Sequence, residues 1–155
     1  MTFKRGSVID LLVIPVVLFA FGFYLYISYY TVDTVGASPM LNATVITAGK
    51  QALTNYGLTF PMLAIVWGAT SVVLAWTFGG SPVTYVLSAL ATGFIMMVSA
   101  QLSDTFEVIQ TYFPSTTINA MPFVGTINLN LPIYVLGWGV LVIIATHRGG
   151  GGTEI

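Results

Sequence analysis

Residues 58–102, LTFPMLAIVWGATSVVLAWTFGGSPVTYVLSALATGFIMMVSAQL, decide the fold of this chain. This stretch contains no Asp, Glu, Lys or Arg, and none occurs anywhere from Gln51 to Ser103. Two apolar runs, residues 58–78 and 82–102, lie on either side of a short polar interruption. Each run reaches the roughly 20 residues that a helix needs to cross a bilayer. The stretch therefore predicts two membrane-spanning helices.

The interruption between the two runs reads Gly-Gly-Ser-Pro. A glycine at position 79 or 80 can adopt the left-handed conformation that ends a helix. Ser81 is a good N-cap, and Pro82 suits the first helical position because its missing N–H has no partner to lose there. Trp76 and Tyr85 are expected at the membrane surface. The short turn predicts a tight hairpin whose two helices are antiparallel neighbours.

Two further runs, residues 8–30 and 131–147, are predicted to span as well. The first follows a basic flank and ends in a cluster of tyrosines, the aromatic pattern of a membrane interface. A cleaved signal peptide is the alternative, since the segment Val35–Ser38 offers small residues. The run is too long and too aromatic for the apolar region of a signal peptide, so a retained anchor is expected.

The composition agrees with a bilayer as the solvent. The chain of 155 residues is 56% hydrophobic and only 6% charged, whereas a soluble domain is about a quarter charged. The net charge of −1 leaves no basic stripe for nucleic acid. Cysteine is absent, which excludes disulfides and thiolate metal sites. We predict an all-α membrane protein, one integral membrane domain over residues 1–155, without a cofactor.

The orientation follows from the charged residues. Basic residues flank the membrane on the side of both chain ends: Lys4, Arg5 and Arg148. Acidic residues fall on the other side: Asp33, Asp104 and Glu107. Lys50 is the one exception. Because basic residues favour the cytoplasmic side, both termini are predicted to be cytoplasmic or inside an enveloped particle.

Two segments, residues 31–57 and 103–130, are predicted to lie outside the membrane. Ser38 followed by proline indicates a helix start, and we expect a helix that lies on the membrane or on a partner. In the second segment the third span is expected to continue as helix and to stop before Pro114. Residues 126–132, TINLNLP, alternate apolar and Asn residues, which suggests a short strand.

Small residues recur within the spans at the spacing of one helix face. The residues predicted to serve in helix packing are Ala64, Gly68, Ser88, Ala89, Thr92 and Gly93. Such faces let helices approach closely where lipid provides no hydrophobic drive for association. The alternative is that hydroxyl and amide side chains of the spans line a pore. That polar set comprises Thr70, Ser71, Ser88, Thr92, Ser99 and Gln101.

Few residues are candidates for chemistry. Asp104 and Glu107 are three apart on one helix face. They lack the third polar group that acid–base or cation chemistry needs, so a partner-facing role is expected. His147, the only histidine, is interpreted as a cation at a helix C-terminus. Asp10 lies near the basic N-terminus and is expected at the interface. No catalytic or metal-binding residue is predicted.

The external segments carry the functional hypothesis. They hold only Asp33, Lys50, Asp104 and Glu107 as charged residues, and are rich in Thr, Asn and apolar side chains. An uncharged, apolar surface is typical of an interface. Residues 42–44, Asn-Ala-Thr, also form a glycosylation triplet, a short motif that arises often by chance.

We therefore expect a non-enzymatic structural component of a larger membrane assembly. Two settings fit: a virion membrane protein that links bilayer to capsid, and an accessory subunit of a membrane complex. Its partners would be lipid and other protein subunits, with a homo-oligomer left open. The alternative is a pore-forming protein of holin type, although the glycine-rich tail lacks the strong charge usual there. An ion-coupled transporter is disfavoured because no charge lies at depth.

Overall fold

Six helices form the described part of the chain in a computed structural model, which describes the backbone of residues 6–38, 42–78 and 82–148. Side chains are described for 13–38, 42–77, 83 and 85–148. The helices are α1 (Gly6–Gly36), α2 (Ala43–Phe78), α3 (Pro82–Gln110), α4 (Ser115–Ala120), α5 (Pro122–Leu129) and α6 (Leu131–Arg148). Four of them, α1, α2, α3 and α6, are long and apolar enough to cross a membrane. The predicted all-helical class and these four helices are confirmed.

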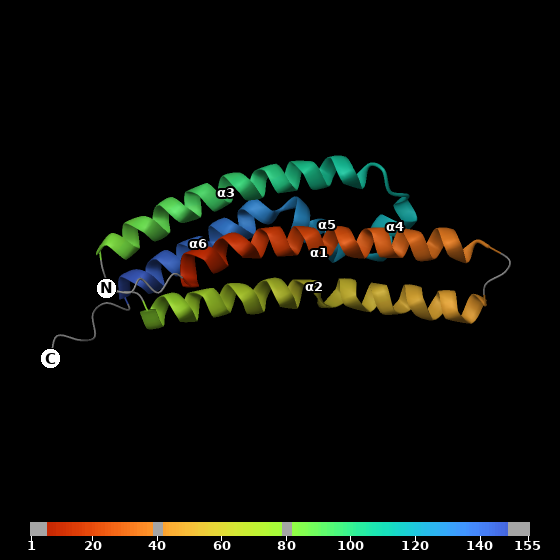
Figure 1. Ribbon diagram of the computed structural model, residues 1–155, viewed down its shortest axis with the longest axis horizontal. Helices are drawn as coiled ribbons and strands as arrows, with labels where there is room; N and C mark the ends of the chain where they lie inside the picture. The colour runs from red at the N-terminus through yellow and green to blue at the C-terminus, as the bar shows by residue number, and fades with distance from the viewer. Residues whose placement is uncertain (1–5, 39–41, 79–81, 149–155) are drawn as a thin grey trace.

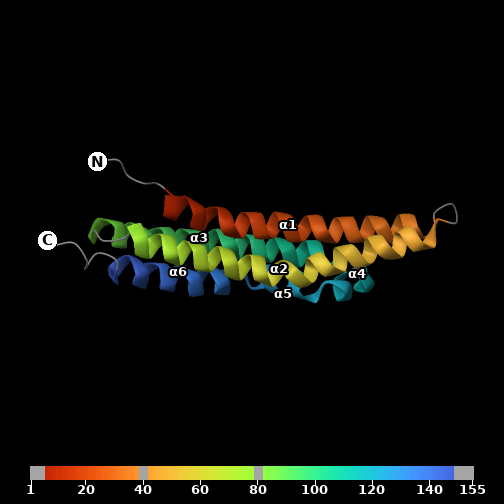
Figure 2. The same cartoon turned by 90° about the horizontal axis from the view of Figure 1, so that it is seen from below.

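The long helices lie side by side in an elongated bundle (Figure 1). The start of α1, the end of α2, the start of α3 and the end of α6 share one end of the bundle. The end of α1 and the start of α2 form the opposite end. Figure 2 shows α1 along one side of the bundle, with α4, α5 and α6 along the other side. Among the described residues α6 packs against both α2 and α3, and α1 also packs against both.

Two parts of this bundle are distinguished below. The span region comprises residues 6–22, 58–78, 82–102 and 131–148, and the head comprises residues 23–38, 42–57 and 103–130. The boundary on α1 follows from packing, because Gly22 lies against Asn128 of α5, next to the predicted start of the fourth span. Residues 23–30 of α1 are thus level with the head. The predicted first span, 8–30, therefore extends about two turns beyond the level of the other three.

The expected packing of α2 directly on α3 is wrong for the part of the chain that the structure describes. The two helices lie at diagonal positions, and α6 packs between them. The faces of α2 and α3 that carry the small residues both contact α6. Gly68 of α2 lies against Trp138, and Thr92 of α3 lies against Gly139. A short connection limits how far apart two helix ends can be, but packing decides which faces meet. The turn itself, residues 79–81, lies outside the described residues.

Two expectations for the external segments are also wrong. Residues 43–57 form no separate surface helix, because α2 runs unbroken from Ala43 to Phe78. It packs in the head along α1, where Gly36 lies against Ile46. Residues 126–132, predicted as a strand, instead form the end of α5 and the start of α6. Val124, Ile127 and Asn128 are buried at helical spacing, which outweighs the local alternation. The expected continuation of the third span is confirmed, since α3 ends at Gln110.

The larger core lies in the head and at its junction with the span region. Its aromatic centre joins Tyr26 of α1 to Phe106 of α3, with ring centroids 5.5 Å apart, and to Phe113, at 5.6 Å. Met121 and Val124 complete it from the α4–α5 segment. A smaller core within the span region contains only α2, α3 and α6 residues, and two of its five buried members are alanines. The interior of the head is therefore packed and continuous with that of the span region, to which Ile14, Leu18 and Ala64 of the larger core belong.

Candidate functional site

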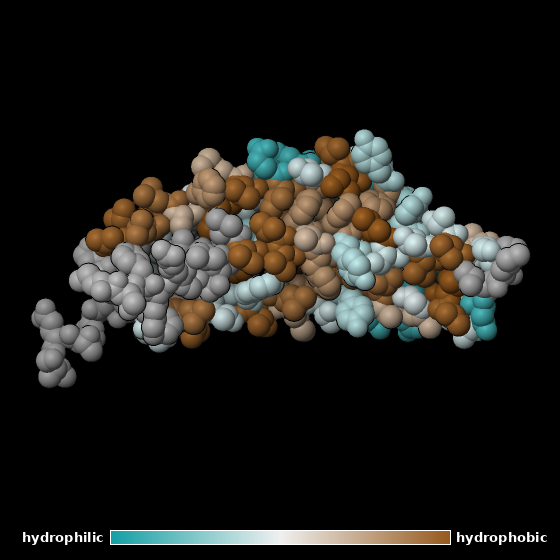
Figure 3. All heavy atoms as spheres, in the orientation of Figure 1, coloured by the Kyte–Doolittle hydropathy of each residue, from teal (hydrophilic) through white to brown (hydrophobic). Residues whose placement is uncertain are grey.

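Exposed apolar side chains are concentrated in the span region. Large examples on α2, α3 and α6 are Met62, Val66, Leu90, Met97 and Ile133. In water such side chains would normally be buried, so their exposure is compatible with helices that cross a membrane. Figure 3 shows brown residues over much of the bundle, with pale and teal ones more frequent toward the end where α1 meets α2. The surface thus distinguishes the same two parts as the packing.

Four of the six predicted packing residues are buried within the chain. Gly68 lies so close to Trp138 that an added Cβ would overlap the indole ring, and Thr92 meets Gly139 in the same way. Ala64 and Ser88 are also buried. Ala89 and Gly93, in contrast, are exposed on α3, and no atom lies within 4 Å of a Cβ added at Gly93. Among the described residues, Gly93 therefore makes no close contact, and Ala89 is exposed beside it on α3.

The buried hydroxyl groups of the span region do not form a polar path. Thr92 donates to the carbonyl of Ser88 at 2.8 Å, and Ser99 donates to that of Ile95 at 2.8 Å. Ser71 and Thr146 likewise donate to carbonyls four residues earlier on their own helices. Each hydroxyl is thus satisfied locally, the usual way for Ser and Thr to be accommodated in an apolar helix. A single chain offers no polar channel through these residues.

The junction between α5 and α6 is held by a side chain of α3. The N–H of Ile133 donates to Asn130 at 3.0 Å, and Pro132 has no N–H, so the carbonyl of Leu129 loses its helical donor. The hydroxyl of Ser103 donates to this carbonyl at 2.6 Å. A buried carbonyl without a donor costs about 1–3 kcal/mol. Ser103 therefore stabilises the break.

Close contacts also join the helices of the head to one another and to α1 at the boundary with the span region. The amide of Gln110 donates to the Tyr26 hydroxyl at 3.3 Å, and Gly125 lets α5 approach both groups. Asn128 is fully buried against Gly22 and donates to the carbonyl of Val124 at 2.9 Å. These side chains fix the positions of α1, α3 and α5 relative to one another. They were not singled out from the sequence, because nothing local marks them as contacts.

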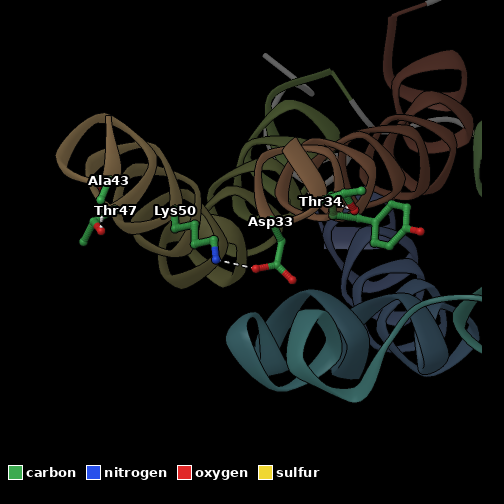
Figure 4. A network of polar contacts seen from close by, with 6 residues as sticks. Asp33, Thr34, Ala43, Thr47 and Lys50 are labelled. Atoms are coloured by element: carbon green, nitrogen blue, oxygen red, sulfur yellow. Dashed lines mark hydrogen bonds and ion pairs between the residues drawn. The ribbon is translucent and has the colours of Figure 1, made fainter. Parts of the chain in front are cut away.

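The far end of the head is tied by one ion pair. Lys50 of α2 donates to the carboxylate of Asp33 of α1, and both side chains are about a third exposed (Figure 4). This hydrogen bond raises the pKa of Lys50 above its ordinary value, an effect that partial burial opposes. Lys50 was the exception to the charge asymmetry across the membrane. In the structure its charge is compensated by Asp33, so the head has no unpaired cation among its described residues.

The remaining candidates stand apart from one another. Asp104 and Glu107 are exposed on α3 at the base of the head. His147 is exposed at the end of α6, with its ring 5.7 Å from that of Tyr85. Asp10 lies in α1, but its side chain is outside those described. No three His, Asp or Glu side chains of the described residues are placed to hold a metal ion.

Among the described residues, the cavity enclosed between the helices is small, and a wider hollow at the start of α2 is shallow and open. An apolar cavity of about 20 Å³ lies where α1, α2 and α6 meet, lined by Ile14, Pro15, Leu18, Ala64, Leu131, Tyr134, Val135 and Trp138. Roughly one water would fill it, and its walls offer almost no polar group. A substrate pocket normally measures about 300–1,000 Å³ with a few convergent polar groups. This cavity therefore does not support a catalytic or cofactor role.

Comparison of the chain with protein families, with characterised proteins and with solved structures finds no match. The function is therefore inferred from the chemistry and packing of the chain itself.

Proposed function

We propose that this chain is a non-enzymatic, multi-pass membrane component that holds a rigid helical head at a fixed position above the bilayer. The head would fasten it to neighbouring proteins of a larger assembly, such as a virion that contains a membrane or a respiratory-type complex. The observation that carries this proposal is the continuity of the long helices. α1, α2 and α3 each run as one helix from the span region into the head, and Pro61 lies inside α2 close to the boundary.

This continuity has a mechanical consequence. The aromatic core around Tyr26 and Phe106 locks α1 to α3 just beyond the span region. A head joined to its anchor by a flexible loop would move independently, whereas one built on continued helices transmits position and orientation. The 15 residues of α2 from Ala43 to Gly57 extend roughly 22 Å beyond the predicted span at 1.5 Å per residue. A rigid spacer of this kind suits a structural role.

We propose the surface of the head as the place for partners. Only part of the apolar residues of the external segments is buried, including Phe106, Met121 and Val124. Others, such as Val45, Tyr56 and Phe123, are exposed among Thr, Ser, Asn, Gln and Ala side chains. One strip of α3 and the turn after it combines acidic and apolar side chains, and we call it the α3 flank: Asp104, Glu107, Val108, Thr111 and Tyr112.

The α3 flank combines features of a protein interface. Tyr112 is 81% exposed, more than any other large apolar or aromatic side chain of the described residues. Tyrosine is enriched at interfaces, where its ring anchors the contact. Asp104 and Glu107 add two negative charges beside it, which would steer a partner with a basic patch. We therefore propose this flank as the protein-facing surface, with both chain termini on the opposite side of the membrane.

Native mass spectrometry of the tagged chain from its own membrane, released in mild detergent, tests the proposal. We expect a defined complex with other protein subunits. The double variant Glu107→Lys with Tyr112→Ala should release the partner, whereas Gln51→Lys with Asn55→Lys, exposed on α2, should leave the complex intact. A monodisperse single chain from the native source contradicts the proposal.

The pore-forming alternative has its own test. No specific observation favours it, because the buried hydroxyls of a single chain bond within their own helices. A pore between several copies would still release a dye from liposomes as protein density rises. Leakage that scales with protein density would replace the structural proposal with this alternative.

A further inference from the structure

The start of α2 places the triplet Asn42-Ala43-Thr44 at the end of the head. Side chains of all three residues are exposed. The triplet matches the Asn-X-Thr acceptor pattern, and a match becomes meaningful only where the asparagine is accessible on a translocated surface. No other Asn-X-Ser/Thr triplet occurs in the sequence. The structure thus puts the chain's single such triplet at the start of α2, at the end of the bundle opposite the end of α2 and the start of α3 (Figure 1).

The local geometry leaves the reactive atom available. Asn42 Oδ1 accepts a hydrogen bond from the backbone N–H of Thr44 at 2.9 Å, and so caps α2. Its carbonyl accepts a further bond from the N–H of Val45 at 3.0 Å. Within the described residues, neither Asn42 Nδ2 nor the Thr44 hydroxyl has a recorded partner. The cap therefore uses the oxygen of the amide and leaves the nitrogen to solvent.

Glycosylation is chemically compatible with this cap. The amide nitrogen attacks the anomeric carbon of an oligosaccharide carried on a polyprenyl diphosphate. An N–C bond forms, the bond from that carbon to the phosphate oxygen breaks, and polyprenyl diphosphate leaves as the amide loses one proton. Because the nitrogen keeps its second hydrogen and the oxygen is untouched, the bond from Thr44 to Asn42 can persist in the product.

The surroundings give such a modification a physical role. Near the triplet, α2 exposes Val45, Thr47 and Ala48. The nearest described charges, Asp33 and Lys50, neutralise each other. The distal end thus has little charge to keep it soluble, and a bulky hydrophilic glycan would supply that solvation. The α3 flank lies at the base of the head, so a glycan at the distal end would leave it open.

We propose that Asn42 is an acceptor for N-linked glycosylation. This inference rests on the proposed orientation, in which the head lies on the translocated side of the membrane. The full-length chain is synthesised with microsomes that also modify a reference glycoprotein. The expected result is one step of reduced mobility in a gel, removed by an endoglycosidase, with the glycan located on Asn42 by peptide mass spectrometry.

Two variants remove the acceptor and keep the helix cap. Asn42→Asp retains a capping oxygen but has no amide nitrogen. Thr44→Ala retains Asn42 and its bond to the backbone N–H of residue 44 but lacks the hydroxyl of the triplet. Both are expected to abolish the mobility step, whereas Thr44→Ser should keep it. A step that persists in Asn42→Asp overturns the assignment of Asn42.

Two added triplets separate a failure of this inference from a failure of the proposed orientation. Pro114→Asn creates Asn-Ser-Thr at the exposed start of α4 in the head, where asparagine suits an N-cap. Gly151→Asn creates Asn-Gly-Thr in the C-terminal tail. We expect a second glycan with the first variant and none with the second. An unmodified wild-type chain overturns the inference whatever the added triplets do. If only the Pro114→Asn triplet gains a glycan, the proposed orientation stands and the inference about Asn42 is wrong. If only the Gly151→Asn triplet gains a glycan, both the inference and the proposed orientation are wrong.

Discussion

Gly139 of α6 lies directly against the side chain of Thr92 of α3, leaving no space for a methyl group at position 139. Two residues earlier on α6, Gly137 is exposed, and no atom would lie within 4 Å of a Cβ built there. The two glycines share one helix and one sequence motif, Gly-Trp-Gly. Only one of them permits close approach of helices, the usual device by which apolar helices associate in lipid.

The first prediction compares these two glycines. Gly139→Ala forces α3 and α6 apart or Thr92 out of its rotamer, and such overpacking typically costs about 1–3 kcal/mol. Gly137→Ala adds a methyl group to an open surface and gains up to about 1 kcal/mol of helix propensity. Thermal unfolding in detergent should therefore show a lowered midpoint for Gly139→Ala and an unchanged or raised one for Gly137→Ala. Equal effects of the two substitutions contradict the α3–α6 contact.

The second prediction concerns the pairs of small residues on α2 and α3. Gly68→Leu should strongly destabilise the isolated chain, because Trp138 occupies the space that a side chain would need. Ala89→Leu and Gly93→Leu should leave its thermal midpoint unchanged, since both positions are exposed. If α3 contacts another subunit in the assembly, the α3 variants lose that subunit in native mass spectrometry while the fold survives. A lowered midpoint for Gly93→Leu in the isolated chain would refute the observed packing.

The third prediction tests the α5–α6 junction. Ser103→Ala removes the donor that the described residues offer to the carbonyl of Leu129, at a cost of about 1–3 kcal/mol for a partly buried group left unsatisfied. Ser99→Ala is the matched control on the same face of α3, because its hydroxyl bonds only to its own helix. Chemical unfolding in mixed micelles should destabilise Ser103→Ala clearly more than Ser99→Ala. Faster amide exchange at residues 130–134 in Ser103→Ala would locate the effect at the junction.

The fourth prediction concerns the ion pair at the end of the head. Because the pair is about a third exposed, its contribution to stability should not exceed about 1 kcal/mol, measured as the coupling in a double-mutant cycle of Asp33→Asn and Lys50→Met. The pKa of Lys50 is raised in the folded chain, so this contribution is fully present below the ordinary value of 10.5. It is lost as the pH rises through the higher folded pKa. A coupling that grows between pH 9 and pH 12 would have the wrong sign.

The aromatic core of the head shows how far local patterns reach. Tyr26 and Tyr30 end a long apolar run and were expected at a membrane interface. In the structure Tyr26 is buried against Phe106, and Tyr30 packs edge-on to Phe113 at 5.8 Å. Residues separated by about 80 positions in the chain make these contacts. A sequence pattern reports the polarity of one helix, and it carries no record of which other helix will cover it.

The sequence by itself determined the four long apolar helices, the extension of the third beyond its apolar run and the helical start at Pro82. These features follow from the length of charge-free runs, from the position of proline and from the absence of strand-forming alternation over any long stretch. Tertiary structure alone decided that α6 separates α2 from α3 and that Gly68 and Gly139 are contacts while Gly93 and Gly137 are not. It also decided that residues 126–132 form the end of α5, a turn at Asn130 and the start of α6. The reason is that a small residue permits close approach without specifying a partner. The choice of partner depends on how all the helix faces fill space together.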